Sequence, residues 1–289
     1  MITIVGGTGR LGRLVAAMLV EDGHQVRLVG RSAPGDPPPG TEFLAADVRA
    51  PATLGPALSG SSVVVSAVHG MDPGSGESPA EIDRDGNLAL IAAARAAGAD
   101  IVLVSAVGAS DQHPMELMRM KAAAEQQLRD GEPGRVDWTV VRPTAYAAMH
   151  AEVIRQLAGR RGVPRVFGRG VNPINFVDVR DAAVAVHRAV VDPSLRGAVI
   201  EVGGPEDLTM SELARLATGR QRVGHIPRAG LRTMSVLLAR VRPAQSRLAR
   251  MALQLDTLPM TFDATAARAA YPWLPCTPVA EALGRPDAG

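Results

Sequence analysis

The sequence contains little cysteine, little aromatic character and no long apolar run. Of its 289 residues only Cys276 is a cysteine, and aromatic residues make up 3%. A single cysteine cannot form an intramolecular disulfide, so we expect a reducing, cytoplasmic environment. Met1 leads into the first apolar run without the regions of a secretory signal, and no uncharged stretch is long enough to span a bilayer. We therefore expect no membrane partner.

Positively and negatively charged side chains are present in nearly equal numbers. Lys and Arg together number 31 and Asp and Glu 29. The arginines are scattered and no basic run is interleaved with aromatic residues, so we expect no nucleic-acid partner. The histidines are spread out without metal-ligand spacing, so we predict no metal site. The length and the 46% hydrophobic content allow one large domain or one domain with an appendage.

Lysine is almost absent. Lys121 is the only one, and every other basic side chain counted with it is arginine. A compact ammonium differs chemically from a planar, permanently charged guanidinium. In such an arginine-rich chain, we interpret the single lysine as a candidate active-site residue.

The first half of the chain alternates short Val/Ile/Leu-rich runs with longer Ala/Leu/Arg segments. This alternation is typical of β-α units around a buried parallel sheet. Strands are predicted at residues 2–5, 25–29, 42–45, 62–66, 101–105 and 137–141. Helices are predicted at residues 10–21, 52–59, 79–97 and 114–129. We therefore predict an α/β fold with a Rossmann-like, doubly wound parallel sheet, and we assign residues 1–143 to an NAD(P)-binding core.

The pattern loosens beyond residue 143. Helices are predicted at residues 145–157, 179–191 and 211–217, and strands at residues 173–176 and 198–202. A Met/Leu/Arg-rich segment of helical character follows at residues 230–258. We assign residues 144–289 to a smaller, mostly helical C-terminal lobe, partly integrated with the core sheet, and we expect it to hold the substrate.

A glycine-rich segment, Gly6-Gly7-Thr8-Gly9-Arg10-Leu11-Gly12, directly follows the first predicted strand. At a strand-to-helix turn, glycines leave room for a pyrophosphate and the helix N–H groups point at its charge. We predict that this turn binds a dinucleotide. The predicted contacts are Gly6, Thr8, Gly9, Arg10, Leu11 and Gly12.

The end of the second predicted strand distinguishes between two cofactors. It carries Arg31 where an NAD-binding chain would carry an acidic residue. Arginine suits a 2′-phosphate, and Arg10 could clamp the same phosphate, so we predict NADP in preference to NAD. The loops after the third and fourth strands add Asp47, Val48, Ala67 and Val68 as candidate contacts to the adenine, ribose and pyrophosphate. For Asp47, a helix cap is the alternative.

Further segments complete an ordered set. Residues 104–108, the helix with Lys121 and the run from Asp137 to Pro143 follow in order, as do residues 175–183 and 202–209. With the glycine turn, this set resembles the short-chain dehydrogenase/reductase superfamily, specifically its atypical, NmrA-like, NAD(P)H-binding branch. The resemblance implies that Lys121 contacts the nicotinamide ribose, that Ser105 carries a catalytic hydroxyl, and that Pro143 lies at the nicotinamide end.

The chain departs from that family at the proton donor. The superfamily's tyrosine lies four residues before the lysine, and that position is Leu117, which cannot donate a proton. Three interpretations remain open. Lys121 itself does the acid/base work, or Tyr146 supplies a hydroxyl or shapes the pocket, or no proton relay exists.

The resemblance implies an NADP-preferring oxidoreductase that transfers hydride between nicotinamide and a small, moderately apolar carbonyl, enone, imine or quinone. The alternatives are a catalytically silent NADP(H)-binding sensor and an isomerase or epimerase that recycles its cofactor. A small-molecule substrate is the expected partner. The oligomeric state is open, with a homodimer as one option.

Overall fold

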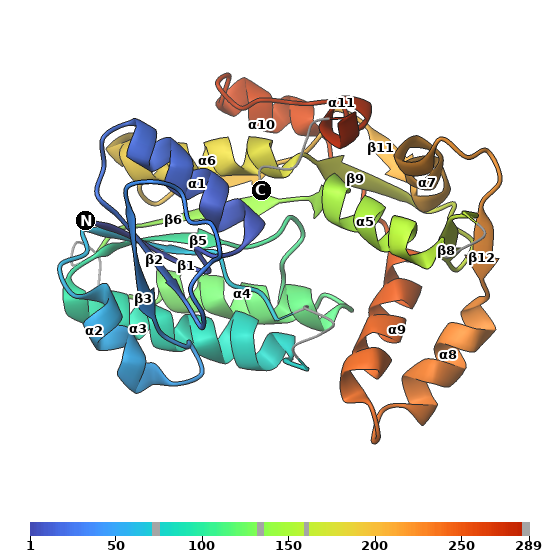
Figure 1. Ribbon diagram of the computed structural model, residues 1–289, viewed down its shortest axis with the longest axis horizontal. Helices are drawn as coiled ribbons and strands as arrows, with labels where there is room; N and C mark the ends of the chain where they lie inside the picture. Colours follow the sequence, from blue (N-terminus) through green and yellow to red (C-terminus); the bar gives the residue numbers. More distant parts are fainter. Residues whose placement is uncertain (71–75, 132–135, 159–161, 285–289) are drawn as a thin grey trace.

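A seven-stranded sheet forms the centre of the molecule. The computed structural model describes residues 1–70, 76–131, 136–158 and 162–284. The strands of this sheet are all parallel and lie in the order β10-β6-β5-β4-β1-β2-β3 (Figure 1). They are β1 (Ile2–Val5), β2 (Val26–Gly30), β3 (Thr41–Ala45), β4 (Val63–Ser66), β5 (Asp100–Val104), β6 (Trp138–Pro143) and β10 (Val199–Val202). The predicted Rossmann-like fold is confirmed.

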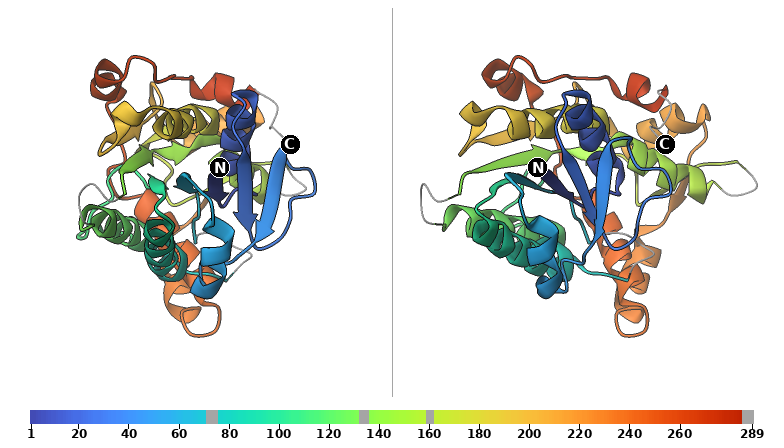
Figure 2. Two further views of the ribbon diagram at one scale, coloured as in Figure 1. Left: turned by 90° about the vertical axis from the view of Figure 1, so that its left-hand side faces the viewer. Right: turned by 60° about the vertical axis from the view of Figure 1, so that its left-hand side comes forward.

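Helices cover both faces of this sheet, which is why β1 and β4 are buried along their whole length. The helices α1 (Arg10–Glu21) and α6 (Val179–Val191) lie on one face. On the other lie α2 (Leu54–Leu58), α3 (Asn87–Ala97) and α4 (Glu116–Arg129), as Figures 1 and 2 show. Two apolar cores result, one including Val15, Leu19 and Val186 and the other including Leu54, Leu90 and Leu128. The fold therefore has the three layers expected of a doubly wound sheet.

Part of the chain beyond residue 143 returns to the central sheet. β10 pairs in parallel with β6, with Val199 opposite Val140, and α6 packs against α1. The strand predicted at residues 198–202 is therefore the seventh strand of the core sheet. The division of the chain at residue 143 stays a prediction.

The remaining segments form a smaller lobe. One small sheet has the order β11-β9-β7 and another pairs β12 with β8. Their strands are β7 (Ala145–Tyr146), β8 (Arg165–Phe167), β9 (Pro173–Val177), β11 (Asp207–Thr209) and β12 (Gly224–Ile226). The helices are α5 (Ala147–Leu157), α7 (Met210–Thr218), α8 (Arg228–Leu237), α9 (Pro243–Leu255), α10 (Ala264–Ala270) and α11 (Val279–Gly284). The lobe has its own core around Ile154, Phe176 and Leu213.

Three predicted helices differ in detail from the observed ones. The helix predicted from residue 145 begins at Ala147, because residues 145–146 pair with β9. The one predicted at residues 52–59 is a 3₁₀ turn, η1 (Pro51–Thr53), followed by α2. The one predicted at residues 79–97 begins as a π-helical segment, η2 (Ala80–Gly86), before α3. A second 3₁₀ turn, η3 (Pro193–Leu195), precedes β10. π-helical turns are frequent at functional sites, and η2 carries Asp83 to the candidate site.

The helices α8 and α9 form a hairpin that stands out from the body (Figure 1). They pack mainly on each other around Leu231, Ala249 and Ala252. In the part of the chain that the structure describes, this and every other helix is too short or too polar to cross a membrane.

Candidate cofactor and active site

The turn between β1 and α1 is tightly packed against the loop after β4. Gly6 has a φ of +83°, and a Cβ on it would lie 2.7 Å from the carbonyl oxygen of Ala67. A Cβ on Gly12 would lie 2.5 Å from the Gly6 carbonyl oxygen and 2.7 Å from Gly7 Cα. Contacts this short exclude a side chain, so the fold itself requires glycine at these two positions.

Gly9 is different, because the protein leaves its surroundings open. A Cβ there would come no closer than 3.4 Å to a heavy atom, the Gly6 carbonyl oxygen. Gly9 is the exposed N-cap of α1, and no side chain of the described residues caps this helix end, whose first turn also has no acidic residue. Within the described residues, the first N–H groups of α1 therefore have no side-chain acceptor at the N-cap, and they carry the positive end of the helix dipole. This arrangement fits a pyrophosphate.

The sheet topology brings the predicted contacts to one edge. The chain leaves β1 toward β2 on one side and β4 toward β5 on the other, although β1 and β4 are neighbours. Such a reversal forms a crevice at the carboxyl ends of the strands. Ala67 donates its N–H to the Val5 carbonyl at 2.8 Å, so the loop with Val68 starts directly beside the glycine turn.

The other predicted residues of the turn differ in their contacts. Thr8 lies against the end of β2, within 3.1 Å of a Cβ placed on Gly30. Leu11 packs against the apolar core. The guanidinium of Arg10 lies 3.7 Å from Glu152 Oε2 on α5, so this side chain links α1 to the smaller lobe.

Two arginines converge on one carboxylate at the ends of β2 and β3. Arg31 forms an ion pair with Glu77 Oε1, and Arg49 Nη1 lies 3.1 Å from the same oxygen. Both guanidinium groups are partly exposed, whereas the Glu77 side chain is 6% exposed. Sequence reasoning found Arg31 but missed Arg49, whose signal was its place in the loop after the third strand. Two guanidinium groups around one anion form a site that can also hold a phosphate.

Asp47 and Val48 contribute to this edge mainly through local structure. Asp47 accepts hydrogen bonds from the backbone N–H and the side chain of Arg49, and these bonds lower the pKa of Asp47. Its own N–H donates to Thr53 Oγ1 at 3.1 Å. The i, i+2 hydrogen bond from Arg49 forms a local Asx turn and not the helix cap that was the alternative for Asp47, because η1 begins after Ala50 and has no side-chain cap. Val48 is buried, and a Cβ on Gly86 would lie 2.6 Å from its Cγ2 atom.

Lys121 is fixed by a buried ion pair at the carboxyl end of β5. Its Nζ lies 3.1 Å from Asp83 Oδ1 and donates to the Val104 carbonyl at 3.2 Å. Asp83 is fully buried, and its Oδ2 accepts the N–H of Gly70 at 2.8 Å. The contact with Asp83 Oδ1 is an ion pair without hydrogen-bond geometry, so the Val104 carbonyl is the hydrogen-bond acceptor of Lys121 within the described residues. An ammonium has three N–H donors, so Lys121 can also donate to a ligand. Sequence reasoning missed Asp83.

Ser105 lies beside this pair but is bonded to a different carboxylate. Its hydroxyl donates to Glu125 Oε1 at 2.5 Å. The Arg142 guanidinium holds both oxygens of Glu125, at 2.9 and 2.6 Å, and Arg129 reaches Oε2 at 2.8 Å. Burial opposes ionisation of Glu125, but the hydrogen bonds from Arg142 and Ser105 outweigh it, so the pKa of Glu125 is lowered. The single proton of Ser105 is therefore directed at Glu125.

Tyr146 and His150 stand where α5 begins. The Tyr146 hydroxyl is buried and, among the described residues, has no hydrogen-bond partner; burial raises its pKa. Burial lowers the pKa of His150, whose Nδ1 lies 3.0 Å from the Tyr146 carbonyl oxygen. Pro143 ends β6, and its carbonyl accepts the N–H of Val107 at 3.0 Å. Leu117 lies on the first turn of α4, one turn before the lysine.

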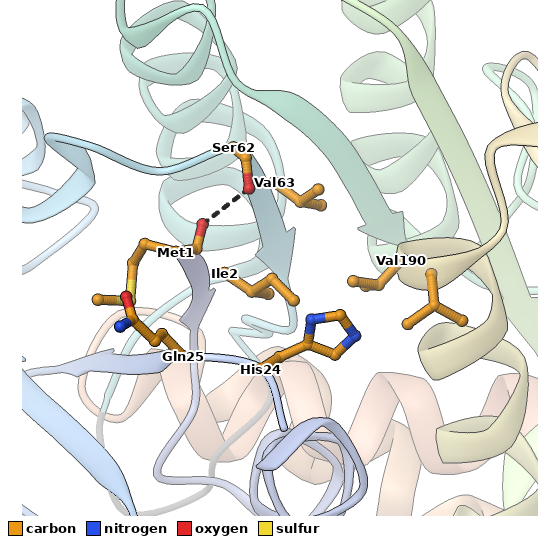
Figure 3. Close-up of a pocket in the computed structure, with 8 residues that line it drawn as sticks. Met1, Ile2, His24, Gln25, Ser62, Val63 and Val190 are labelled. Atoms are coloured by element: carbon orange, nitrogen blue, oxygen red, sulfur yellow. Dashed lines mark hydrogen bonds between the residues drawn. The ribbon is translucent and has the colours of Figure 1, made fainter. Parts of the chain in front are cut away.

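A separate hollow of about 240 Å³ opens at the opposite end of the sheet (Figure 3). It is lined by Met1, His24, Ser62 and Val190 among others, and Ser62 Oγ donates to the Met1 carbonyl at 3.1 Å. These residues lie at the amino ends of β1 and β4, away from the glycine turn. No candidate site residue lines it, so we place the site at the carboxyl edge.

Comparisons with known proteins agree with a dinucleotide site at this edge of the sheet. The profile of the NAD(P)H-binding family matches residues 6–165, which confirms the resemblance seen in the sequence. An NAD(P)H azoreductase from Xenophilus azovorans is 29% identical over 74% of this chain and 71% of its own. A photosystem II assembly factor from Trieres chinensis is 28% identical over 74% of this chain and 67% of its own. The crystal structure of an Escherichia coli NADPH-dependent quinone oxidoreductase with NADPH has the same fold, with a TM-score of 0.72 over 98% of each chain and 22% identity.

Alanine substitutions at the open Gly9 and at the packed Gly12 should have different effects on stability and on dinucleotide affinity. Gly9→Ala should fold with an unfolding free energy within about 1 kcal/mol of the parent, yet bind dinucleotide at least about tenfold more weakly, because its methyl group stands before the α1 N–H groups. Gly12→Ala is the matched control, and overpacking should cost it about 1–3 kcal/mol. Urea unfolding and titration with NADPH measure both. An unchanged affinity for NADPH in Gly9→Ala would contradict the assignment of the pyrophosphate to this helix end.

The lowered pKa of Glu125 predicts how stability depends on pH. Glu125→Gln should lower the free energy of unfolding at neutral pH by about 3 kcal/mol, because a buried charge network loses its anion. A carboxyl with a depressed folded pKa stabilises the protein above its unfolded pKa, and this contribution is lost as pH falls through the folded pKa. The difference from the parent should therefore shrink below about pH 4. Urea unfolding across this range tests it.

Glu42→Gln is the matched control for this series. Glu42 is 48% exposed and paired with Arg27, so its replacement should cost under about 1 kcal/mol. A Glu125→Gln deficit that stays constant down to acidic pH would contradict the assignment.

Proposed function

The chain belongs to the NAD(P)H-binding family, and we propose that it is an NADPH-preferring reductase of a small, moderately apolar acceptor such as a quinone or azo compound. The names of the azoreductase relative and of the quinone oxidoreductase with the same fold support this class of acceptor. The free helix end at Gly9 supports dinucleotide binding. When bound, the reduced nicotinamide supplies a hydride.

The observation that carries the cofactor preference is the pair of arginines on Glu77. Arg31 and Arg49 stand at the ends of adjacent strands and hold one carboxylate oxygen between them. A 2′-phosphate offers oxygen acceptors of the same kind and more negative charge than a carboxylate. We therefore assign both arginines to the 2′-phosphate of NADPH. In the free protein, Glu77 is the internal anion that the phosphate displaces.

Lys121 is the residue that we assign to the reacting end. Its ammonium is held by the ion pair with Asp83 and by the hydrogen bond to the Val104 carbonyl, and it has further N–H donors for a ligand. A positive group held in a nearly buried position stabilises the negative charge that develops on an acceptor oxygen or nitrogen. The ribose hydroxyl or the acceptor itself can receive the remaining hydrogen bond.

The missing tyrosine limits the range of acceptors. Ser105 directs its proton at Glu125, and Leu117 has none to donate. A quinone or azo acceptor accommodates negative charge after hydride transfer and takes its proton from Lys121 or from water, so it needs less acid catalysis than a simple ketone. This reasoning favours such acceptors over simple ketones.

A second candidate is a protein that binds NADPH without turning over a substrate. The photosystem II assembly factor among the relatives is named for assembly and not for catalysis. The internal partners of Arg31, Lys121 and Ser105 are compatible with such a role as well. Oxidation of NADPH by purified protein in the presence of a naphthoquinone or an azo dye separates the two. Binding without any oxidation would favour the second candidate.

Substitutions of Arg31 and of Glu77 should have opposite effects on the affinity for NADPH. Arg31→Ala should weaken NADPH binding at least about tenfold and NADH binding by much less, because it removes charged hydrogen bonds to the 2′-phosphate. Glu77→Gln should tighten NADPH binding severalfold, because it removes the competing charge. Calorimetric titration with both nucleotides measures these changes. Arg27→Ala, on β2 just before Arg31 and paired with Glu42, should change neither affinity. Equal losses for NADPH and NADH in Arg31→Ala would contradict the assignment.

The proposed role of Lys121 predicts that its replacement lowers the rate of turnover. Lys121→Met should lower kcat about 100-fold with a naphthoquinone as acceptor, the size of effect seen when one preorganised donor is removed. The variant leaves Asp83 buried without its cation, so it is compared with Lys121→Met/Asp83→Asn, which removes both charges. The double variant should be more stable than Lys121→Met, but its kcat should remain low. Unchanged turnover in the stable double variant would exclude Lys121 from the reaction.

A further inference from the structure

The tip of the α8–α9 hairpin, defined as residues 236–242, exposes large apolar side chains. Val236 is 72%, Leu237 69% and Val241 79% exposed, and Met234 on the preceding turn is 43% exposed. Figure 1 shows that this tip is the part of the hairpin farthest from the body. A protruding apolar group of this kind on a soluble chain indicates an interaction surface.

The same hairpin carries positive charge only. From Leu213 to Leu255 the sequence contains no Asp or Glu. The arginines of the hairpin are Arg228, Arg232, Arg240, Arg242, Arg247 and Arg250. Four of them, at positions 232, 240, 242 and 250, are exposed and have no ion-pair partner among the described residues. The partner of this surface must therefore be negatively charged.

The hairpin is anchored to the body at its base and along α9. At the base, Arg228 donates to the side chain of Asp256, the C-cap of α9, at 2.5 Å, and Asp256 accepts the backbone N–H groups of Arg169 and Gly170 at 2.9 Å. In the first half of α9, Arg247 donates to the Glu77 carbonyl at 2.7 Å. Gln254 donates to the Pro114 carbonyl at 3.0 Å, beside the start of α4. Inside the hairpin, Ser246 Oγ donates to the Ser235 carbonyl at 2.6 Å. The tip is thus held at a fixed distance from the carboxyl edge of the sheet, with its apolar side chains directed away from the protein's own core.

We propose that the α8–α9 hairpin docks on the surface of an anionic lipid membrane. Arginines flanking an apolar tip match the two layers of such a surface, because the guanidinium groups meet lipid phosphates and the apolar groups enter the acyl boundary. A second copy of the chain would bring like charges together, so self-association through this surface is opposed. The tip is a narrow projection, and a protein partner would need a matching groove.

This proposal goes beyond the reductase function and does not depend on it. We expected no membrane partner because no segment can span a bilayer. Surface docking needs no spanning segment, only buried apolar area and attraction to anionic headgroups. The charge and the apolar tip act together, so removal of either should release the protein.

Vesicle co-sedimentation of the full chain tests the proposal without any nucleotide. The probes are vesicles of phosphatidylcholine alone and of phosphatidylcholine mixed with phosphatidylserine. The parent should bind the mixed vesicles and be released by salt. Arg240→Gln/Arg242→Gln should weaken binding about 25-fold, about fivefold for each arginine. The triple variant Val236→Ser/Leu237→Ser/Val241→Ser should weaken it at least about tenfold.

Matched control variants carry the same substitutions elsewhere. Val171→Ser/Leu216→Ser removes two exposed apolar groups, 56% and 47% exposed, that lie outside the hairpin. Arg155→Gln/Arg188→Gln removes two exposed arginines on α5 and α6. Both controls should bind vesicles like the parent. Thermal unfolding of every variant shows that each is folded, and NADPH affinity, measured separately, keeps a failure of the reductase proposal distinct from this one.

Several outcomes would overturn the proposal. Absence of binding to the mixed vesicles is one, and equal binding to phosphatidylcholine alone is another. A dimer in analytical ultracentrifugation that the tip variant abolishes would assign the surface to a second copy. Binding to polyglutamate that matches binding to the vesicles and survives the tip variant would assign it to an acidic protein.

Discussion

The close approach of the Gly6 backbone to the Ala67 carbonyl is the constraint on which the site depends. It joins the first turn of the fold to the loop after β4, the strand that lies beside β1. Because no side chain fits between them, α1 starts directly at the crevice, and among the described residues no side chain caps its N-terminus. The dinucleotide site is therefore a consequence of sheet topology and of missing side chains, more than of any single polar residue.

Internal partners hold the charged groups of this edge in place. Two arginines share Glu77, Lys121 is paired with Asp83, and Ser105 donates to Glu125. Such pairs orient the groups before a ligand arrives, which lowers the cost of ordering them on binding. The pairs differ in the exposure of their cations. The carboxylates of Glu77, Asp83 and Glu125 are all buried, but the Arg31 and Arg49 side chains on Glu77 are 52% and 42% exposed, whereas the Lys121 side chain is 9% exposed.

The hairpin connects this edge to a distant surface. Arg247 and Gln254 on α9 bond to the Glu77 and Pro114 carbonyls, and the tip carries exposed apolar and basic groups. The molecule thus carries a nucleotide crevice and a basic projection that are joined by direct hydrogen bonds. The proposed acceptor and the proposed lipid surface are chemically compatible, because both favour low polarity.

The sequence by itself determined the Rossmann-like sheet and the glycine turn, and it singled out Arg31 and Lys121 as candidate site residues. These rest on local signals: the period of apolar residues, glycines at a fixed place after a strand, and a residue type used once. Only the tertiary structure decided that Arg49 joins Arg31 on Glu77, that Asp83 pairs with Lys121, and which strand completes the sheet. Those contacts join residues from different elements, and periodicity along the chain carries no information about which side chains meet in space.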